Sequence, residues 1–306
     1  MIEYDAHKWT DHLFDIKGSM VREITGRVAA VVGWAAAVVA FHLYVRPVAV
    51  PSTVHALVGV AIGLLLVIRT NASYERFWEG RKMWGGMVNE SRNLARAARA
   101  FLPDAPEIAD RISLWTAAFA YSSMHTLRGS KSLGRFSERL PAEEVRNVLA
   151  ADHVPSAIAL RISNLLADAR REGHVSDYVM MTLDNNVQLL IDYIGACERI
   201  HKTPLPFAYV VHLRRALILY CLTLPFALIE SYGWSTVIDT LLIAYILFGI
   251  EEIGVEIEDP FGKDDNDLPL EQICATIERN LLSVIRPGTE FISKAFAFLL
   301  LPLALI

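Results

Sequence analysis

The sequence predicts an all-α integral membrane protein with four transmembrane helices and a helical domain in the cytoplasm. Three observations lead to this fold class. Hydrophobic residues make up 53% of the 306 residues, while charged residues still make up 21%. Long uncharged segments are separated by charged ones, and we find no strand-like alternation of apolar and polar residues. We therefore expect one part of the chain to lie in a bilayer and another part in water.

The first hairpin is expected over about residues 26–68. Residues 28–45 contain no Asp, Glu, Lys or Arg, and a helix of this length rises about 27 Å, close to the hydrocarbon thickness of a bilayer. Residues 47–68 form a second uncharged segment. Pro47 and Pro51 separate the two segments, because proline ends a helix or begins the next one.

A second hairpin is expected over about residues 214–251. Its apolar block is interrupted by Glu230, Gly233 and Asp239. Ser, Tyr and Trp residues around this break are typical of a turn at the membrane interface. We therefore predict two short spans joined near Gly233.

Basic residues gather at one side of the predicted spans. The two hairpin tips carry only Arg46. By the positive-inside rule we expect both termini to lie in the cytoplasm. We also expect the protein to lie in the inner (plasma) membrane of the cell. The residues that give this orientation are Lys17, Arg22, Arg27, Arg69, Arg76, Arg81, Lys82, Arg214 and Arg215.

The cytoplasmic region is expected over about residues 69–213 and 252–306. Helix formers and acidic first turns predict helices at residues 89–101, 141–150, 155–172 and 176–200. The last seventeen residues are apolar but short and interrupted by proline. We expect them to pack on a surface or at the membrane face rather than to form a fifth span.

The second span continues without a strong breaker to about residue 101, so we expect one helix to leave the bilayer and enter the cytoplasm. Within it, Val60, Leu64 and Ile68 recur at i, i+4 and i+8 and form a stripe on one side. Such spacing is typical of aliphatics that face lipid or a core. The alternative is a ring around a symmetry axis, which would gate ions by dewetting.

Three long blocks of the sequence stand out. They are RTNASYERFWEGRKMWG at residues 69–85, CERIHKTPLPFAY at 197–209 and EDPFGKDDNDLPLEQICATIERNLL at 258–282. These blocks resemble the bestrophin family, especially its bacterial branch. They come in the family's order, and the resemblance covers nearly the whole chain. It implies a single channel unit over residues 1–306 and a homopentamer with one ion pore on the five-fold axis.

The resemblance also implies pore residues. An apolar neck in bacterial relatives matches Val60, Leu64 and Ile68. A second constriction, at the cytoplasmic mouth, follows a Ser-Asp pair that matches Ser176 and Asp177, which puts Tyr178 in the aperture. The alternative for Tyr178 is simple helix packing. Asp177, repeated five times, would concentrate cations, whereas eukaryotic members of the family pass chloride and other small anions.

An acidic stretch follows the last predicted span. Oxygen-rich runs suit calcium, although this spacing does not match an EF-hand. The simpler interpretation is a turn whose Asp or Asn caps the next helix. Eukaryotic bestrophins bind calcium here, and the resemblance places Asp264 and Asp267 at side-chain ligand positions and Asp259 at a carbonyl position. Lys263 stands where that pattern has an acid, and its charge would weaken binding.

We therefore expect a passive channel for small monovalent ions, which the resemblance suggests are anions such as chloride. A cation channel of the same architecture and a calcium-sensing membrane scaffold without a pore stay open as alternatives. A membrane-bound metalloenzyme is disfavoured, because the nine histidines are scattered and no HExxH, GxSxG or P-loop motif occurs. We expect no catalytic site.

The expected partners are further copies of the chain, membrane lipid and small inorganic ions. The net charge of −5 argues against a nucleic-acid partner. The three widely separated cysteines form no disulfide framework and suit a reducing cytosol. We see no cleavable signal peptide, because the first 27 residues carry charges and no apolar core.

Overall fold

The computed structural model describes residues 18–285, which are helical without any strand. The all-α prediction is confirmed for this part of the chain. The chain divides into two compact units. The first runs up to Gly80 and includes Ile200–Leu268, and the second comprises Arg81–Arg199 and the chain from Pro269 onward.

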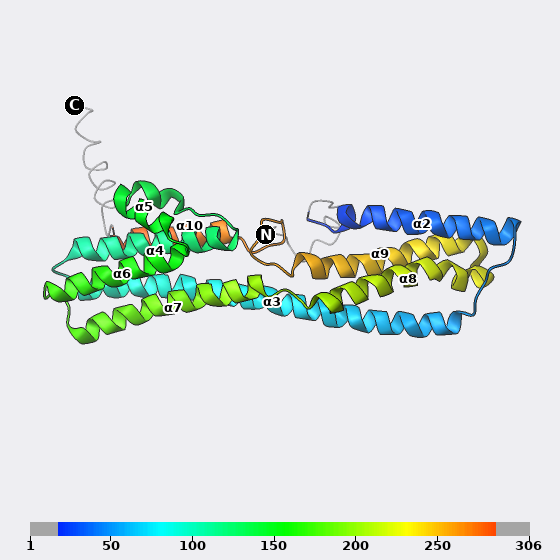
Figure 1. Ribbon diagram of the computed structural model, residues 1–306, viewed down its shortest axis with the longest axis horizontal. Coiled ribbons are helices and arrows are strands. Elements are labelled where there is room, and N and C mark those ends of the chain that lie inside the picture. The colour runs from blue at the N-terminus through cyan, green and yellow to red at the C-terminus, as the bar shows by residue number, and fades with distance from the viewer. Residues whose placement is uncertain (1–17, 286–306) are drawn as a thin grey trace, which may run out of the picture. The chain divides into compact units, whose positions relative to one another are not determined.

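The first unit is built from four helices that run side by side (Figure 1). They are α2 (Val21–Tyr44), the first part of α3 (Ser52–Phe101), α8 (Phe207–Tyr232) and α9 (Thr236–Glu256). A core of Ile24, Val28, Cys221 and Phe248 joins α2, α8 and α9. The turn predicted around the two prolines is confirmed, because α2 ends at Tyr44 and α3 begins at Ser52.

The turn predicted near Gly233 is also confirmed. A short 3₁₀ turn, η2 (Gly233–Ser235), separates α8 from α9. Gly233 has a φ of 52°, in the left-handed region that glycine adopts without a steric penalty. Both helices continue past the charges that seemed to limit the spans, so Glu230 lies within α8 and Asp239 within α9.

Three segments of the described chain are long and apolar enough to cross a membrane. They are Val21–Tyr44, Ser52–Phe101 and Phe207–Glu256, and the last of these is divided by η2. These lengths and compositions are those of a membrane protein.

Helix α3 is continuous over 50 residues, as its lack of strong breakers predicted. The division between the two units falls within it after Gly80, well past the predicted membrane edge at residue 68. In the second unit, a Cβ at Gly86 would lie 2.5 Å from the ring of Tyr193. Because Gly86 has no side chain, α3 can approach α7 (Asp177–Lys202) closely.

The second unit is centred on α4 (Pro106–Leu127), which packs against α6 and α10 (Figure 1). Trp115 and Phe119 of α4 are fully buried. The helices around it are α5 (Ala142–Ala150), α6 (Val154–Arg171), α7 (Asp177–Lys202) and α10 (Leu270–Ile285), with the 3₁₀ turn η1 (Gly134–Glu138) between α4 and α5. The helices predicted at residues 141–150, 155–172 and 176–200 correspond to α5, α6 and α7.

A buried polar contact joins α4 to α10 in this unit. The hydroxyl of Tyr121 donates to Oε2 of Glu278 at 2.7 Å, and Arg135 donates to the same oxygen at 3.1 Å. Burial, followed by the carboxylate of Glu278, raises the pKa of Tyr121 to about 12. Tyr121 therefore stays a neutral hydrogen-bond donor at any physiological pH.

The three cysteines, Cys197, Cys221 and Cys274, are buried and form no disulfide. Burial raises the pKa of the Cys274 thiol far above its usual range. Both chain termini, whose cytoplasmic location was predicted, and the apolar segment at residues 290–306 lie outside the described residues.

Candidate functional site

The predicted neck residues lie on one face of α3 and are uncovered in the single chain. Val60, Leu64 and Ile68 are 74%, 62% and 49% exposed. Ile62 and Leu66 are buried against α8. At 100° per residue the two sets lie on faces of α3 about 180° apart, so the stripe points away from the core of the first unit.

An exposed aliphatic stripe is unfavourable in water, since roughly 25 cal/mol is lost per Å² of apolar surface left uncovered. Two surroundings would cover it: lipid chains, or the same face of further copies of α3. These are the two alternatives that the spacing left open, and the assignment of Val60, Leu64 and Ile68 to a neck stays a prediction.

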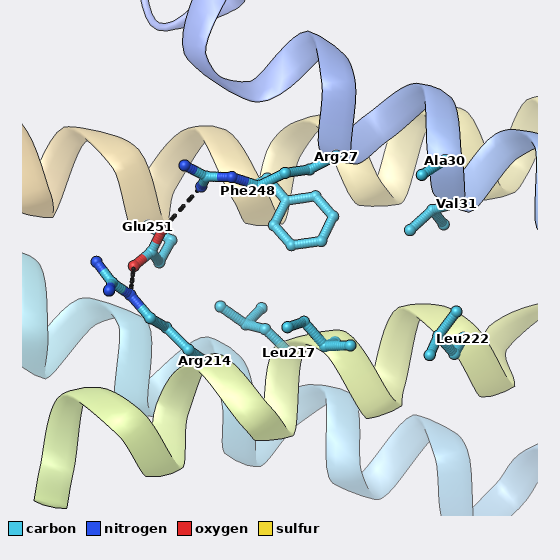
Figure 2. Close-up of a pocket in the computed structure, with 9 residues that line it drawn as sticks. Arg27, Ala30, Val31, Arg214, Leu217, Leu222, Phe248 and Glu251 are labelled. Atoms are coloured by element: carbon cyan, nitrogen blue, oxygen red, sulfur yellow. Dashed lines mark hydrogen bonds and ion pairs between the residues drawn. The ribbon is translucent and has the colours of Figure 1, made fainter.

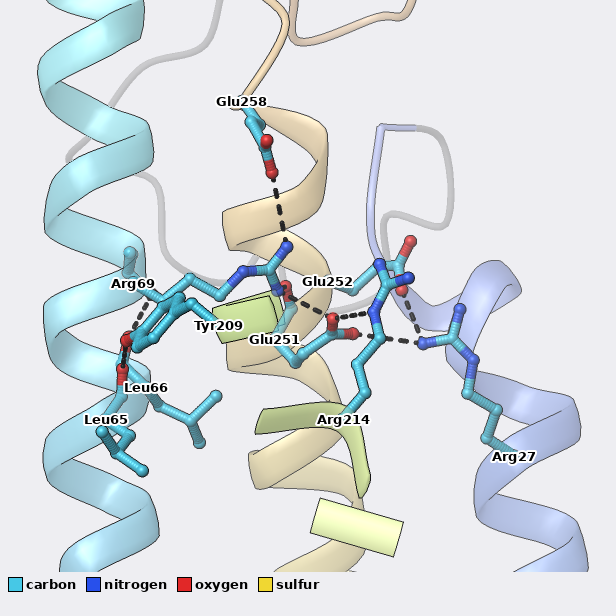
Figure 3. Close-up of polar contacts among 10 residues, drawn as sticks. Arg27, Leu65, Leu66, Arg69, Tyr209, Arg214, Glu251, Glu252 and Glu258 are labelled. Atoms are coloured by element: carbon cyan, nitrogen blue, oxygen red, sulfur yellow. Dashed lines mark hydrogen bonds and ion pairs between the residues drawn. The ribbon is translucent and has the colours of Figure 1, made fainter. Parts of the chain in front are cut away.

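The residue that follows this stripe, Arg69, is buried on the opposite side of α3. It is only 1% exposed. Its Nη1 donates to Oε1 of Glu251 at 2.7 Å and to the backbone carbonyl of the same residue at 3.1 Å, and its Nη2 lies 3.5 Å from Oε2 of Glu258 (Figure 3). One turn earlier, the hydroxyl of Tyr209 donates to the carbonyl of Leu65 at 2.8 Å. The back of α3 is thus held to α8 and α9.

Glu251 is shared by three arginines. Besides Arg69, its Oε1 accepts from Nε of Arg214 at 2.9 Å, and its Oε2 lies 3.4 Å from Nη1 of Arg27. Arg27 also bonds Glu252 at 2.7 Å. We call these five residues the arginine cluster. Because Arg27 belongs to α2, Arg69 to α3, Arg214 to α8 and Glu251 to α9, the cluster ties together all four helices of the first unit (Figure 3).

Sequence reasoning missed the arginine cluster. Arg27, Arg69 and Arg214 were treated only as flanking charges that orient the spans. The sequence does contain a usable signal. Each of these arginines stands at the predicted cytoplasmic end of an apolar segment, and Glu251 stands at the predicted cytoplasmic end of the fourth segment. Helices of similar length packed in hairpins bring such ends to one level, where opposite charges pair.

A pocket of about 470 Å³ lies beside the arginine cluster, between α2, α8 and α9 (Figure 2). One end is lined by Arg27, Arg214 and Glu251. The remaining lining is apolar and consists of Ala30, Val31, Leu217, Ile218, Leu222 and Phe248.

The predicted aperture residues lie at the start of α7. Tyr178 is 85% exposed, which leaves it available to a pore or to a neighbouring chain. Asp177 is ion-paired with Arg170 of α6, and this guanidinium lowers the pKa of Asp177. The pair has no net charge, so the acidic ring expected from the sequence would be largely neutralised.

The three predicted calcium positions line one open pocket of about 740 Å³. The carboxylate of Asp267 accepts from the backbone N–H of Asp264 at 2.7 Å, while Oδ1 of Asp259 lies 3.3 Å from Nδ1 of His201. Within residues 18–285, no group of three or more His, Cys, Asp or Glu residues is placed to hold a metal ion. Calcium binding stays a prediction.

Asp267 is buried, with 3% exposure, and is an unusual acid. Burial raises its pKa to about 6, and the neighbouring Asp264 and Asp259 carboxylates act in the same direction. Its described hydrogen bond is inside the loop rather than to the first turn of α10, so its carboxylate does not serve as the predicted helix cap.

The fold and this geometry define a class of protein: a helical membrane protein in which one long helix carries a bare aliphatic face and is braced from behind by buried charges. Comparison with known proteins gives the family. The sequence model described as "Bacterial/Fungal Bestrophin protein" matches residues 1–283. The chain therefore belongs to the bestrophin family.

Individual relatives agree with this assignment. The voltage-dependent anion channel-forming protein sll1024 of Synechocystis is 38% identical over 91% of this chain and 92% of its own length. The voltage-dependent anion channel-forming protein YneE of Escherichia coli K12 is 34% identical over 93% of this chain and 94% of its own length. A crystal structure of a bacterial bestrophin homologue from Klebsiella pneumoniae matches with a TM-score of 0.82 and 34% identity, over 86% of this chain and 98% of that one.

The chain thus belongs to a family of ion channels and not of enzymes, as the absence of catalytic motifs predicted. The resemblance carried by the three sequence blocks is confirmed.

Proposed function

We propose that this chain is one subunit of a passive, homopentameric channel that conducts small monovalent anions such as chloride across the inner membrane. Four spans, α2, the first part of α3, α8 and α9, would place both termini in the cytoplasm. The observation that carries the proposal is the uncovered stripe of Val60, Leu64 and Ile68 on α3. Membership of the bestrophin family and the names of its anion channel-forming relatives support it.

In this proposal five copies of the stripe face one another around the pore axis. An aliphatic constriction excludes ions because an ion cannot shed its hydration water cheaply in apolar surroundings. The pore then conducts when the five helices move outward and water refills the neck. The arginine cluster, one residue beyond Ile68 and on the opposite face, would set the resting position of α3.

The charges near the predicted aperture give no support to the cation alternative. A free ring of Asp177 would attract cations, but Asp177 is paired with Arg170. An apolar neck has no charge sign of its own. The electrostatic argument for a cation channel therefore loses its main support.

The proposal is tested by reconstituting the purified protein in a planar bilayer under an asymmetric KCl gradient. A reversal potential near the chloride equilibrium value supports the anion channel, and a value near that of potassium overturns it in favour of the cation alternative. If native mass spectrometry shows a pentamer and no current appears under any applied voltage, the scaffold alternative is favoured.

The neck itself is tested by replacing Val60, Leu64 and Ile68 together with alanine. Single-channel conductance should rise severalfold, because the apolar constriction becomes wider and easier to wet. Ile238→Ala is a matched control, since Ile238 of α9 is 68% exposed but lies outside the stripe. Unchanged conductance in the triple variant would remove these residues from the gate.

A further inference from the structure

We propose that the pocket beside the arginine cluster is a specific site for an anionic phospholipid of the bilayer. Its phosphate would be held by Arg27 and Arg214, and part of an acyl chain would lie along the apolar walls (Figure 2). One such site exists in each subunit. This proposal rests on the proposed function in one respect only: the orientation proposed there makes the cytoplasmic leaflet the source of the lipid.

The shape and lining of the pocket fit an amphiphile. Its volume of about 470 Å³ lies within the range of small-molecule sites. Polar groups are confined to one end, as Figure 2 shows, while Val31, Leu217 and Phe248 line the part beyond. A hydrophilic anion would use only the polar end, and a neutral apolar molecule would leave the arginines unused.

The two arginines have donors to spare. Among the described residues, Arg214 uses only its Nε, which donates to Glu251, so both of its terminal nitrogens are unengaged. Arg27 engages Nη1 alone. Both side chains are about half exposed, at 47% for Arg27 and 51% for Arg214. Guanidinium groups with free, accessible N–H donors are well suited to phosphate.

The charge balance of the pocket also favours an anion. Its lining holds two guanidinium groups and one carboxylate, Glu251. Counting also Glu252, which pairs with Arg27, and Arg69, which pairs with Glu251, the five residues of the arginine cluster carry one net positive charge next to the apolar walls. Basic pockets between membrane helices on the cytoplasmic side are suited to anionic lipid headgroups, because the anionic leaflet and the basic residues attract each other.

Lipid binding at this site would affect the predicted neck through Glu251. A phosphate bound to the free nitrogens of Arg27 and Arg214 would offset part of their positive charge and so weaken their attraction to this carboxylate, which would leave Arg69 as its strongest partner. Arg69 follows Ile68 directly, so a lipid at this site would change how firmly the back of α3 is held. Lipid binding and the position of the neck would thus be coupled.

The experiment is a native mass spectrometry titration of the delipidated, detergent-solubilised assembly with palmitoyl-oleoyl phosphatidylglycerol or phosphatidylcholine. We expect up to one phosphatidylglycerol per subunit, bound more tightly than phosphatidylcholine. Arg27→Gln and Arg214→Gln should each weaken phosphatidylglycerol binding about fivefold. Arg215→Gln is the matched control, because Arg215 is an exposed neighbour on α8 that does not line the pocket.

A second variant leaves the arginine cluster intact. Ala30→Phe fills the apolar part of the pocket and should weaken both lipids while the assembly stays whole. Equal affinity for the two lipids, or equal binding by the wild type and the two arginine variants, would overturn the proposal. So would dissociation of the assembly by Ala30→Phe, since a neighbouring subunit would then occupy the pocket. None of these readouts depends on conduction, so failure here is distinct from failure of the channel proposal.

Discussion

Two arginine–carboxylate pairs adjoin the two predicted constrictions, and they differ in burial. Arg69, which follows the predicted neck on α3, pairs with Glu251, and their side chains are 1% and 3% exposed. Arg170 and Asp177 stand beside Tyr178, the predicted aperture residue, with side chains 49% and 64% exposed. The chemistry of the two pairs is the same, but their surroundings are not.

Burial decides what each pair can do. Breaking a buried pair leaves a charge without a partner in an apolar interior, whereas water and salt screen an exposed pair. The pair behind the predicted neck should therefore contribute to stability by holding the helices together. The pair beside the predicted aperture should contribute little to stability and act mainly on the local charge.

The largest expected effect comes from breaking the buried pair. Glu251→Gln should destabilise the protein by about 3 kcal/mol, because the buried Arg69 loses its nearest counter-charge and keeps only the longer contact to Glu258. The measurement is the midpoint of unfolding by sodium dodecyl sulfate, followed by circular dichroism. Asp177→Asn, at the exposed pair, should leave that midpoint unchanged.

The double variant Arg69→Met and Glu251→Leu separates the loss of a pair from the creation of an unpaired charge. Replacing both partners of a buried pair by apolar residues is often neutral, and the remaining partners, Arg27 and Arg214, are half exposed. It should therefore be more stable than Glu251→Gln. If it is less stable, the pair itself contributes net stability and the comparison above is wrong.

A third acid sharpens the comparison, because Asp267 is buried but has no cationic partner among the described residues. Its raised pKa of about 6 means that the folded state keeps the proton which the unfolded chain loses near pH 4. This group therefore lowers the free energy of unfolding as the pH rises from about 4 to about 6. Asp267→Asn should remove this slope and stabilise the protein by about 3 kcal/mol at pH 7.5.

The measurement is the difference in unfolding midpoint between the wild type and Asp267→Asn from pH 4 to pH 8. A difference that is independent of pH would contradict the assignment of the proton to Asp267.

The wild type and the Asp267→Asn variant also test calcium binding. If calcium binds at Asp259, Asp264 and Asp267, adding it at pH 7.5 should stabilise the wild type more than the variant.

The smallest expected effect concerns the exposed pair and is a change of selectivity without a change of stability. Arg170→Gln would uncover Asp177 and move the reversal potential toward the cation value, while Asp177→Asn would uncover Arg170 and move it the other way. The double variant should resemble the wild type. Shifts of the same sign in both single variants would place the pair away from the conduction path.

The helices were largely predictable because their ends depend on local chemistry. Prolines at 47 and 51 and Gly233 mark the two hairpin turns, and α3 runs on because only glycines interrupt it. The effect of charged residues on the helix ends was harder to predict. Glu230 and Asp239 were taken as span limits, yet both lie within helices, since a helix end is decided by backbone conformation and not by charge alone.

Periodicity alone predicted that Val60, Leu64 and Ile68 share one face of α3, and the structure shows that face exposed. The candidate site was not predictable where residues far apart in the sequence share one group. Glu251 meets Arg27 and Arg69 over separations of 224 and 182 residues. The pairing of Asp177 with Arg170 crosses a turn between two helices, which no helical repeat signals.

The burial of all three cysteines makes the native chain a convenient background for chemical labelling. Thiol reagents attack an accessible thiolate, and a buried thiol offers them no access. A cysteine introduced along α3 would thus be the reactive one, with no native residue to remove first. Reading its modification rate from residue 57 to residue 68 would map which side of the helix meets water, and would distinguish a lipid-covered face from a wetted one.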